Sequence, residues 1–274
     1  MMLKRGSRIL LVSIFVVWAA IGLSYGQTAA GAAKNLGPAD IDRIIKKFTA
    51  NEREFRQALA SYAFKRNVMF HTIGLGGQIT GTYRRDSHMT LNTAGERFEK
   101  ILFAPVASVP PGTVTAEDLE DLGGVNAFAL EPRSIDQYNF AYVGTERIDE
   151  LSLYVFDVTP KSIPDPSKKI RLFTGRIWVD VDDLMIVKSK GKGVPETKIN
   201  KFPVVETTRT QVDGKYWFPA DARSDDELVF DNGEVMKIRL RIKYTDYSVG
   251  RSEVRILDDD EPVPTPSPTP KKPE

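Results

Sequence analysis

Residues that could carry out acid–base or nucleophilic chemistry are few in this chain. It contains two histidines, His71 and His88, and no cysteine. Each histidine falls on or beside an expected strand, and no serine or carboxylate stands at a spacing that makes a catalytic triad recognisable. A functional histidine is one interpretation, but an exposed strand position explains both residues more simply. The sequence therefore predicts no catalytic residue, no enzyme activity and no cofactor.

Clustered carboxylates raise the question of a metal site. Asp180, Asp182 and Asp183 resemble the start of a calcium loop, but the glycine and the distal glutamate of that loop are missing. A turn explains the three better, because aspartate side chains bond to nearby backbone N–H groups in turns. The run Asp225–Glu227 also lacks the spacing of metal ligands. We therefore expect no metal site.

A basic stripe lies on one face of the last expected strand of the chain. It consists of Lys237, Arg239, Arg241 and Lys243. Because alternate residues of a strand share one face, these four cations lie together. The stripe is a candidate docking surface for a membrane surface or an envelope protein that carries negative charge. Alternatively, it forms a ladder of ion pairs with Asp225–Glu227, which lies across the last turn.

The N-terminus has the features of a secretory signal peptide over residues 1–26. Three basic residues precede an apolar run over residues 9–23, and small residues stand at Ser24 and Gly26. An uncleaved anchor is the alternative, although the run is short for a membrane span. With no cysteine, the exported chain fits the periplasm. Cleavage would leave a chain close to neutral, which argues against nucleic-acid binding.

One long helix and a series of strands are expected after a linker at residues 27–37. Pro38 suits the first position of a helix, and six apolar residues recur on one helical face: Ile41, Ile44, Ile45, Phe48, Phe55 and Leu59. Strands or hairpins are expected at residues 62–71, 78–85, 96–103, 137–145, 151–160, 170–194, 202–212, 215–221 and 236–244. A short second helix is expected at 115–122, and a disordered Pro-rich acidic tail at 258–274.

The hairpin at residues 170–194 is apolar on both faces. With a two-residue turn at Asp182-Asp183, Val179 opposes Ile186 and Trp178 opposes Val187. One face then carries Phe173, Ile177, Val179, Leu184 and Ile186, and the other carries Leu172, Trp178, Met185 and Val187. Both faces must be covered, or one must line a cavity. We therefore expect a curved sheet whose hollow holds an apolar ligand, with a packed, ligand-free hollow as the alternative.

Two stretches, FTGRIWVDVDDLMIVK (173–188) and VDGKYWFPADARSDD (212–226), resemble strand–turn–strand units of the LolA-like proteins, the outer-membrane lipoprotein-sorting family. The resemblance covers about residues 38–250. It implies a periplasmic carrier with an unclosed β-barrel, in which helices cover the mouth of the barrel and acyl chains are held inside.

These observations predict an α+β fold that is predominantly antiparallel β. It is a curved half-barrel in a single domain at residues 38–257, with the two helices covering its hollow. The candidate lining residues are Phe64, Phe70, Tyr154, Phe156, Ile177 and Val179. The expected function is a monomeric, periplasmic, non-enzymatic binding protein for a lipid or lipidated polypeptide. The alternative is an envelope regulatory or scaffolding module that binds another protein through its surface.

Overall fold

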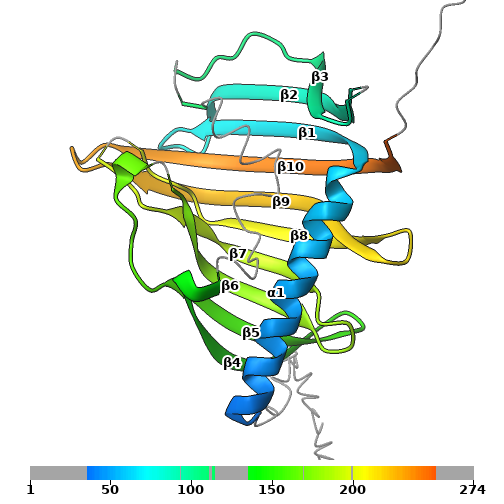
Figure 1. Ribbon diagram of the computed structural model, residues 1–274. Helices are drawn as coiled ribbons and strands as arrows, with labels where there is room; N and C mark the ends of the chain where they lie inside the picture. Colours follow the sequence, from blue (N-terminus) through cyan, green and yellow to red (C-terminus); the bar gives the residue numbers. More distant parts are fainter. Residues whose placement is uncertain are drawn as a thin grey trace, which may run out of the picture.

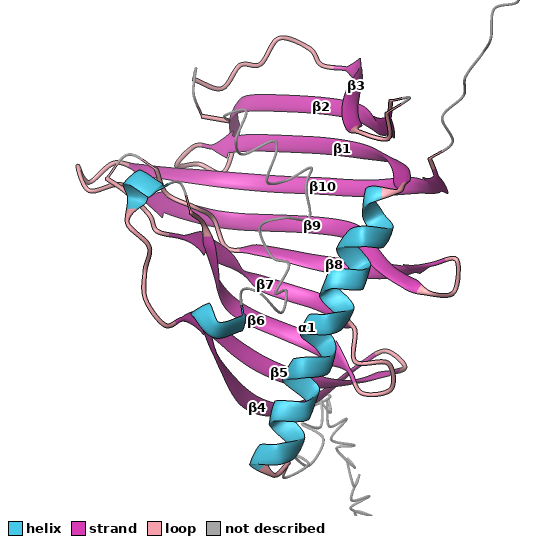
Figure 2. Ribbon diagram, viewed as in Figure 1, coloured by secondary structure: helices cyan, strands magenta, loops and turns pink. Residues whose placement is uncertain are grey.

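One long helix lies across one face of a ten-stranded sheet (Figures 1 and 2). The computed structural model describes residues 36–92, 94–110, 113–114, 135–168, 170–198 and 200–250. The expected signal peptide, the second helix at 115–122 and the tail at 258–274 lie outside these described residues.

The elements follow one another as α1 (Pro38–Ala60), β1 (Tyr62–Ile73), β2 (Ile79–Leu91), β3 (Arg97–Phe103), β4 (Tyr138–Ile148), β5 (Leu151–Pro160), β6 (Leu172–Asp180), β7 (Ile186–Val194), β8 (Val205–Val212), β9 (Tyr216–Val229) and β10 (Val235–Val249). Short 3₁₀ turns occupy Ile135–Gln137 and Pro166–Lys168. The strand order is β3-β2-β1-β10-β9-β8-β7-β6-β5-β4.

The sheet is antiparallel and unclosed, as expected from the sequence. The meander β4–β10 and the meander β1–β3 join where β1 pairs with β10. Strands β3 and β4 form the two edges and do not pair with each other. Figure 1 shows the sheet twisting so that β4–β6 turn underneath α1.

Helix α1 begins and ends where local chemistry allows. Pro38 occupies the first turn, where its missing N–H is not needed, and Asp40 complements the positive helix end. At the other end, the Arg97 guanidinium of β3 donates hydrogen bonds to the carbonyl oxygens of Leu59 and Tyr62. A cation beside the C-terminal end of the helix offsets the negative end of the helix dipole.

Two apolar clusters lie between α1 and the sheet. The Phe55 cluster joins the C-terminal half of the helix to β1, β2, β8, β9 and β10, with Phe55, Leu59, Phe64, Phe218 and Ile242 among its buried members. The Phe48 cluster joins the N-terminal half to β4–β7, with Ile44, Phe48, Phe156, Ile177 and Val179 among its members. One helix thus covers much of this face of the sheet.

The hairpin at residues 170–194 is apolar on both faces, but its turn differs from the expected one. Val179 does oppose Ile186, whereas Trp178 opposes Lys188 instead of Val187, because a bulge interrupts the register. The connection is a five-residue loop at 181–185, not a two-residue turn. The Asp180 carboxylate accepts hydrogen bonds from the backbone N–H groups of Asp182 and Asp183, which favours the longer loop.

The opposite face of this hairpin carries a smaller core. Trp178 and Val187 pack there with Leu153 and Val155 in the Trp178 cluster, with Trp217 partly buried against them. The Lys188 amino group lies 4.8 Å from the centre of the Trp178 ring. Apolar residues therefore lie on both faces of the hairpin for two reasons. Helix α1 covers one face, and the Trp178 cluster forms on the other.

Strands β2 and β9 run further than their sequence patterns predicted. Strand β9 continues to Val229 through Ser224, Asp225, Asp226 and Glu227, which have low strand propensity. Pairing with β10 stabilises this extension, since Asp225 opposes Arg239 and Glu227 opposes Lys237. Cross-strand contacts override propensity at these positions.

Candidate ligand-binding site

The six side chains predicted to line the hollow lie in the two clusters beneath α1. Phe64 and Phe70 belong to the Phe55 cluster, and Tyr154, Phe156, Ile177 and Val179 to the Phe48 cluster. Five of them are buried, and Phe70 is half-buried. The Phe48 ring of α1 lies 5.7 Å from the ring of Phe156. Where α1 crosses the sheet, protein side chains therefore fill the hollow.

Polar contacts fix the middle of α1 between the two clusters. The Glu52 carboxylate accepts two hydrogen bonds from the Arg209 guanidinium of β8, at 2.6 and 3.0 Å. The Arg209 guanidinium also lies 4.3 Å from the centre of the Phe55 ring. Next to Glu52 in the chain, Asn51 donates from its amide nitrogen to the carbonyl oxygens of Asp183 and Leu184. The helix is thus tied to β8 and to the β6–β7 loop.

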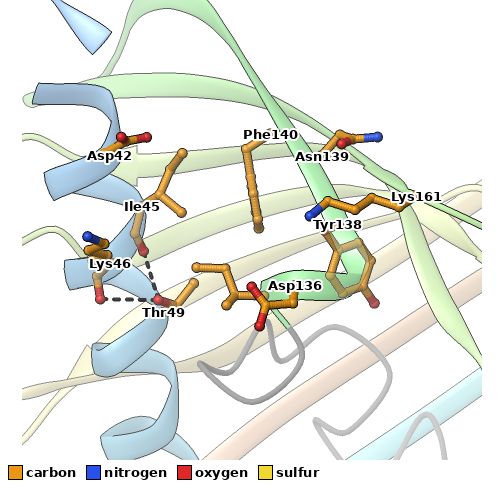
Figure 3. A pocket seen from close by; sticks show the side chains of 10 residues that line it. Asp42, Ile45, Lys46, Thr49, Asp136, Tyr138, Asn139, Phe140 and Lys161 are labelled. Carbon is orange, nitrogen blue, oxygen red and sulfur yellow. Dashed lines mark hydrogen bonds between the residues drawn. The ribbon is translucent and has the colours of Figure 1, made fainter. Parts of the chain in front are cut away.

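An open pocket of about 520 Å³ lies between the N-terminal half of α1 and β4 (Figure 3). This volume falls within the range of small-molecule sites. Its lining residues are Asp42, Ile45, Lys46 and Thr49 of α1 together with Ile135, Asp136, Tyr138, Asn139, Phe140 and Lys161. In Figure 3, Ile45 and Thr49 project from α1 towards Phe140 and Tyr138.

Apolar and charged groups share this pocket. Ile45 and Phe140 give it an apolar wall, and Lys46, Lys161, Asp42 and Asp136 supply charges. None of these four side chains forms an ion pair within the described part of the chain. The Tyr138 hydroxyl accepts a hydrogen bond from the backbone N–H of Phe173 at 3.0 Å. Burial raises the pKa of Tyr138, which keeps this hydroxyl neutral at physiological pH.

The pocket adjoins the packed hollow through Phe48. The Phe48 ring lies 5.6 Å from Phe140, which lines the pocket, and 5.7 Å from Phe156, which was predicted to line the hollow. The side chain of Phe48 therefore contacts both a ring of the pocket wall and a ring of the buried cluster.

The pocket residues were not selected from the sequence as candidates. A signal was present, since Tyr138, Phe140 and Tyr142 alternate along β4 and give one face three aromatic rings. The sequence does not show, however, that this edge strand lies opposite Ile45 and Lys46 of α1. That juxtaposition comes from the tertiary fold.

The basic stripe forms ion pairs with the neighbouring strand. The Lys237 amino group lies 2.6 Å from Glu227, and Arg239 lies 2.8 Å from Asp225. Arg241 also pairs with Asp225, and hydrogen bonds from both arginines lower the pKa of that carboxyl. The ladder of ion pairs considered from the sequence is therefore present, and it partly neutralises the stripe.

A second polar cluster lies on the face of β1–β3 that the Phe55 cluster occupies. The Glu99 carboxylate accepts hydrogen bonds from Arg66, Arg85 and Ser87. Burial alone would raise the pKa of Glu99, but the hydrogen bonds from Arg85 and Ser87 and the charge of Arg66 outweigh it and lower the pKa to about 2. This arrangement holds β3 against β1 and β2.

The other residues considered for chemistry have structural contacts. The Asp183 carboxylate bonds to the backbone N–H of Met185 and to the indole N–H of Trp217, and His71 Nδ1 lies 3.1 Å from Thr82 Oγ1. Within the described residues, no group of three or more His, Cys, Asp or Glu side chains is placed to hold a metal ion. No helix in the same ranges is long and apolar enough to cross a membrane.

Comparisons with known proteins give similarity to solved structures only. No family model matches the chain, and no curated protein matches its sequence. The chain is similar to a DUF1329 family protein from Desulfovibrio piger, at 14% identity and a TM-score of 0.36 over 77% of this chain and 96% of that one. It is also similar to a LolA superfamily protein from Nitrosomonas europaea, at 13% identity and a TM-score of 0.32 over 77% and 93% of the two chains.

A third similar structure is MucB, at 14% identity and a TM-score of 0.28 over 80% of this chain and 62% of that one. The LolA-like resemblance found in the sequence thus recurs among the structures.

Proposed function

We propose that the protein is a periplasmic, non-enzymatic binding protein that holds the acyl chain of a lipid or lipidated polypeptide between α1 and the sheet. The observation that carries the proposal is the open pocket of about 520 Å³ between α1 and β4, which combines an apolar wall with unpaired charges. An amphiphile has the matching chemistry, because its chain buries apolar surface while its headgroup stays near charge and water.

The attachment of α1 supports entry from its N-terminal half. Asn51, Glu52 and the Leu59 carbonyl are held by hydrogen bonds to the sheet side of the molecule. Ile44 and Phe48 are held by apolar packing in the Phe48 cluster. Apolar packing is not directional, so an acyl chain can replace it without leaving a buried polar group unpaired.

Native mass spectrometry of the protein purified from an envelope fraction tests the proposal first. The expected result is a co-purifying species with the mass of a lipid or an acylated peptide. A protein that carries no such species and that binds no fluorescent acyl probe added afterwards would not be a lipid carrier.

Two variants then locate the ligand. Ile45→Trp fills the pocket and should weaken binding of an acyl probe by about tenfold or more, since it removes space that the chain occupies. Phe48→Ala opens the boundary to the buried cluster and should favour probes with longer chains. Lys47→Glu, an exposed substitution on the same helix outside the pocket, is the matched control and should bind as the wild type does.

The alternative is an envelope regulatory or scaffolding module that docks through the basic stripe. Its ion pairs with Asp225 and Glu227 work against this role, because a partner would have to compete with charges already in place. Pull-downs with an Arg239→Ala/Arg241→Ala variant separate the two functions. Loss of a specific protein partner, with acyl-probe binding retained, would favour the scaffolding role.

A further inference from the structure

The edge strand β3 exposes apolar side chains beside an unpaired backbone edge. Strand β3 ends the strand order, so no described strand pairs with its outer side. Phe98, Ile101, Leu102 and Phe103 are each about half exposed. Free edges with apolar side chains tend to pair with another strand, and proteins usually protect them.

The orientation of the backbone shows which residues are available for pairing. The Asn92 N–H donates to the carbonyl oxygen of Glu96, which directs the backbone groups of Glu96 towards β2. Because these directions alternate along an antiparallel strand, the backbone groups of Arg97 and Glu99 point to the open edge. The side chains of Phe98 and Lys100 lie on one face of the sheet, and the side chain of Glu99 lies on the opposite face.

A row of basic side chains crosses the sheet and ends at this edge. Lys65, His88 and Lys100 oppose one another directly on β1, β2 and β3. At the inner end of the row, Asp246 forms an ion pair with Lys65 at 2.7 Å. At the outer end, Lys100 is exposed and has no ion pair among the described residues. An acidic residue on an added strand would complete the row.

We propose that β3 pairs with β3 of a second copy of this chain, antiparallel about a two-fold axis at Phe98. In this register Lys100 of each copy faces Glu96 of the other, Arg97 faces Glu99, and the two Phe98 rings meet. The exposed edge of one copy thus supplies both the missing strand and the missing acid. This departs from the monomer expected from the sequence.

The neighbouring registers are less favourable. An axis at Glu99 would oppose two glutamates, and an axis at Lys100 would oppose two lysines, both of which cost free energy. An axis at Ile101 would leave Lys100 opposite Leu102. The bulge between Asp86 and Ser87 in the β2–β3 register, which leaves Leu102 unpaired, lies outside the stretch from Glu96 to Lys100. A two-fold contact of this kind closes on itself and does not propagate into fibres.

Charge reversal tests the register. In Glu96→Lys, each copy opposes lysine with lysine, and in Lys100→Glu each opposes glutamate with glutamate. Each variant should weaken dimerisation by about tenfold or more, because two symmetric contacts change from attraction to repulsion. The double variant Glu96→Lys/Lys100→Glu should dimerise again, and an equimolar mixture of the two single variants should form a heterodimer. Sedimentation velocity over a concentration series is the measurement.

Controls keep the outcome specific. Lys47→Glu on α1 changes the net charge as Lys100→Glu does and should dimerise as the wild type does. Phe98→Asp should abolish dimerisation, and an unchanged urea midpoint shows that each variant is folded. A wild-type protein that stays monomeric throughout, or single variants that do not recover on mixing, would overturn the proposal. Stronger association of Lys100→Glu would also overturn it, since Lys100 would then be protecting the edge.

Discussion

Glu52 of α1 and Arg209 of β8 form a buried, two-point ion pair. Two guanidinium nitrogens of Arg209 donate to the two carboxylate oxygens of Glu52 at 2.6 and 3.0 Å. The side chains are 0% and 6% exposed, so water does not compensate either charge. The pair lies between the Phe48 and Phe55 clusters and fixes how α1 is placed on the sheet.

Breaking this pair from one side should be costly. Arg209→Met leaves the Glu52 carboxylate buried without its partner, and we expect the free energy of unfolding to fall by about 3–5 kcal/mol. The double variant Glu52→Leu/Arg209→Met removes both charges and should recover most of this loss. Urea unfolding provides the comparison.

The exposed pair between Arg223 and Glu206 is the matched control. Arg223 is 58% exposed, so Arg223→Met should cost less than about 1 kcal/mol. If the double variant at Glu52 and Arg209 were as unstable as Arg209→Met alone, the loss of stability in Arg209→Met would not come from the unpaired Glu52 charge.

The Glu99 cluster predicts sensitivity to acid. The pKa of Glu99 in the folded protein, about 2, is below the usual value of about 4.3 for glutamate, so the charged form of Glu99 stabilises the fold. This stabilisation is complete above the unfolded-state pKa and is lost as the pH falls towards about 2. Urea midpoints measured over this pH range should decline in the wild type.

Glu99→Gln provides the comparison for that decline. It should be less stable than the wild type at neutral pH, because Arg66 and Arg85 lose a carboxylate partner. Its urea midpoint should then change less between about pH 4 and pH 2. An equal decline in the variant would assign the acid sensitivity to other carboxyl groups.

The hydrogen bond of the Tyr62 hydroxyl predicts that Tyr62 loses its proton at a higher pH than an ordinary tyrosine. The hydroxyl donates a hydrogen bond of 2.5 Å to the Asp213 carboxylate, and this bond, together with burial and the nearby negative charge, raises the pKa of Tyr62 to about 12. Asp213→Asn should lower this pKa towards the usual value of about 10. Absorbance titration, with Tyr62→Phe subtracted to isolate the one residue, is the measurement. An unchanged pKa in Asp213→Asn would contradict the assignment to this bond.

Much of the architecture could be predicted from local patterns. Pro38 and the apolar spacing located α1, and the gap between the expected strands at 202–212 and 215–221 located the turn at Asp213 and Gly214, which both have positive φ. The connection is one residue longer than this gap, because Val212 opposes Tyr216. The β6–β7 loop was predicted wrongly because Asp180 bonds the backbone of the turn with its side chain. Bulges of this kind depend on individual side-chain contacts, which a local sequence pattern does not reveal.

The candidate site was less accessible from the sequence than the fold. The apolar face of the hairpin was recognised, but the pocket depends on which edge strand lies opposite Ile45, and that contact is set by tertiary packing. Asn51 and Glu52 interrupt the apolar spacing of α1, although both are buried. Their partners, Leu184 and Arg209, stand more than a hundred residues away in the chain, so a reading of local periodicity does not find them.

A pair of glycines shows how closely β6 and β7 approach. Gly175 and Gly191 oppose each other in register, and the Phe173 ring lies over both. A Cβ on Gly191 would collide with the Thr174 carbonyl oxygen and with the Phe173 ring. Gly191→Ala should therefore push the strands apart and lower the free energy of unfolding by about 1–3 kcal/mol. Gly193→Ala on the same strand is the matched control, because its Cβ would meet only Phe202, at an ordinary 3.7 Å. Equal urea midpoints for the two variants would show that the strands tolerate a methyl group at Gly191.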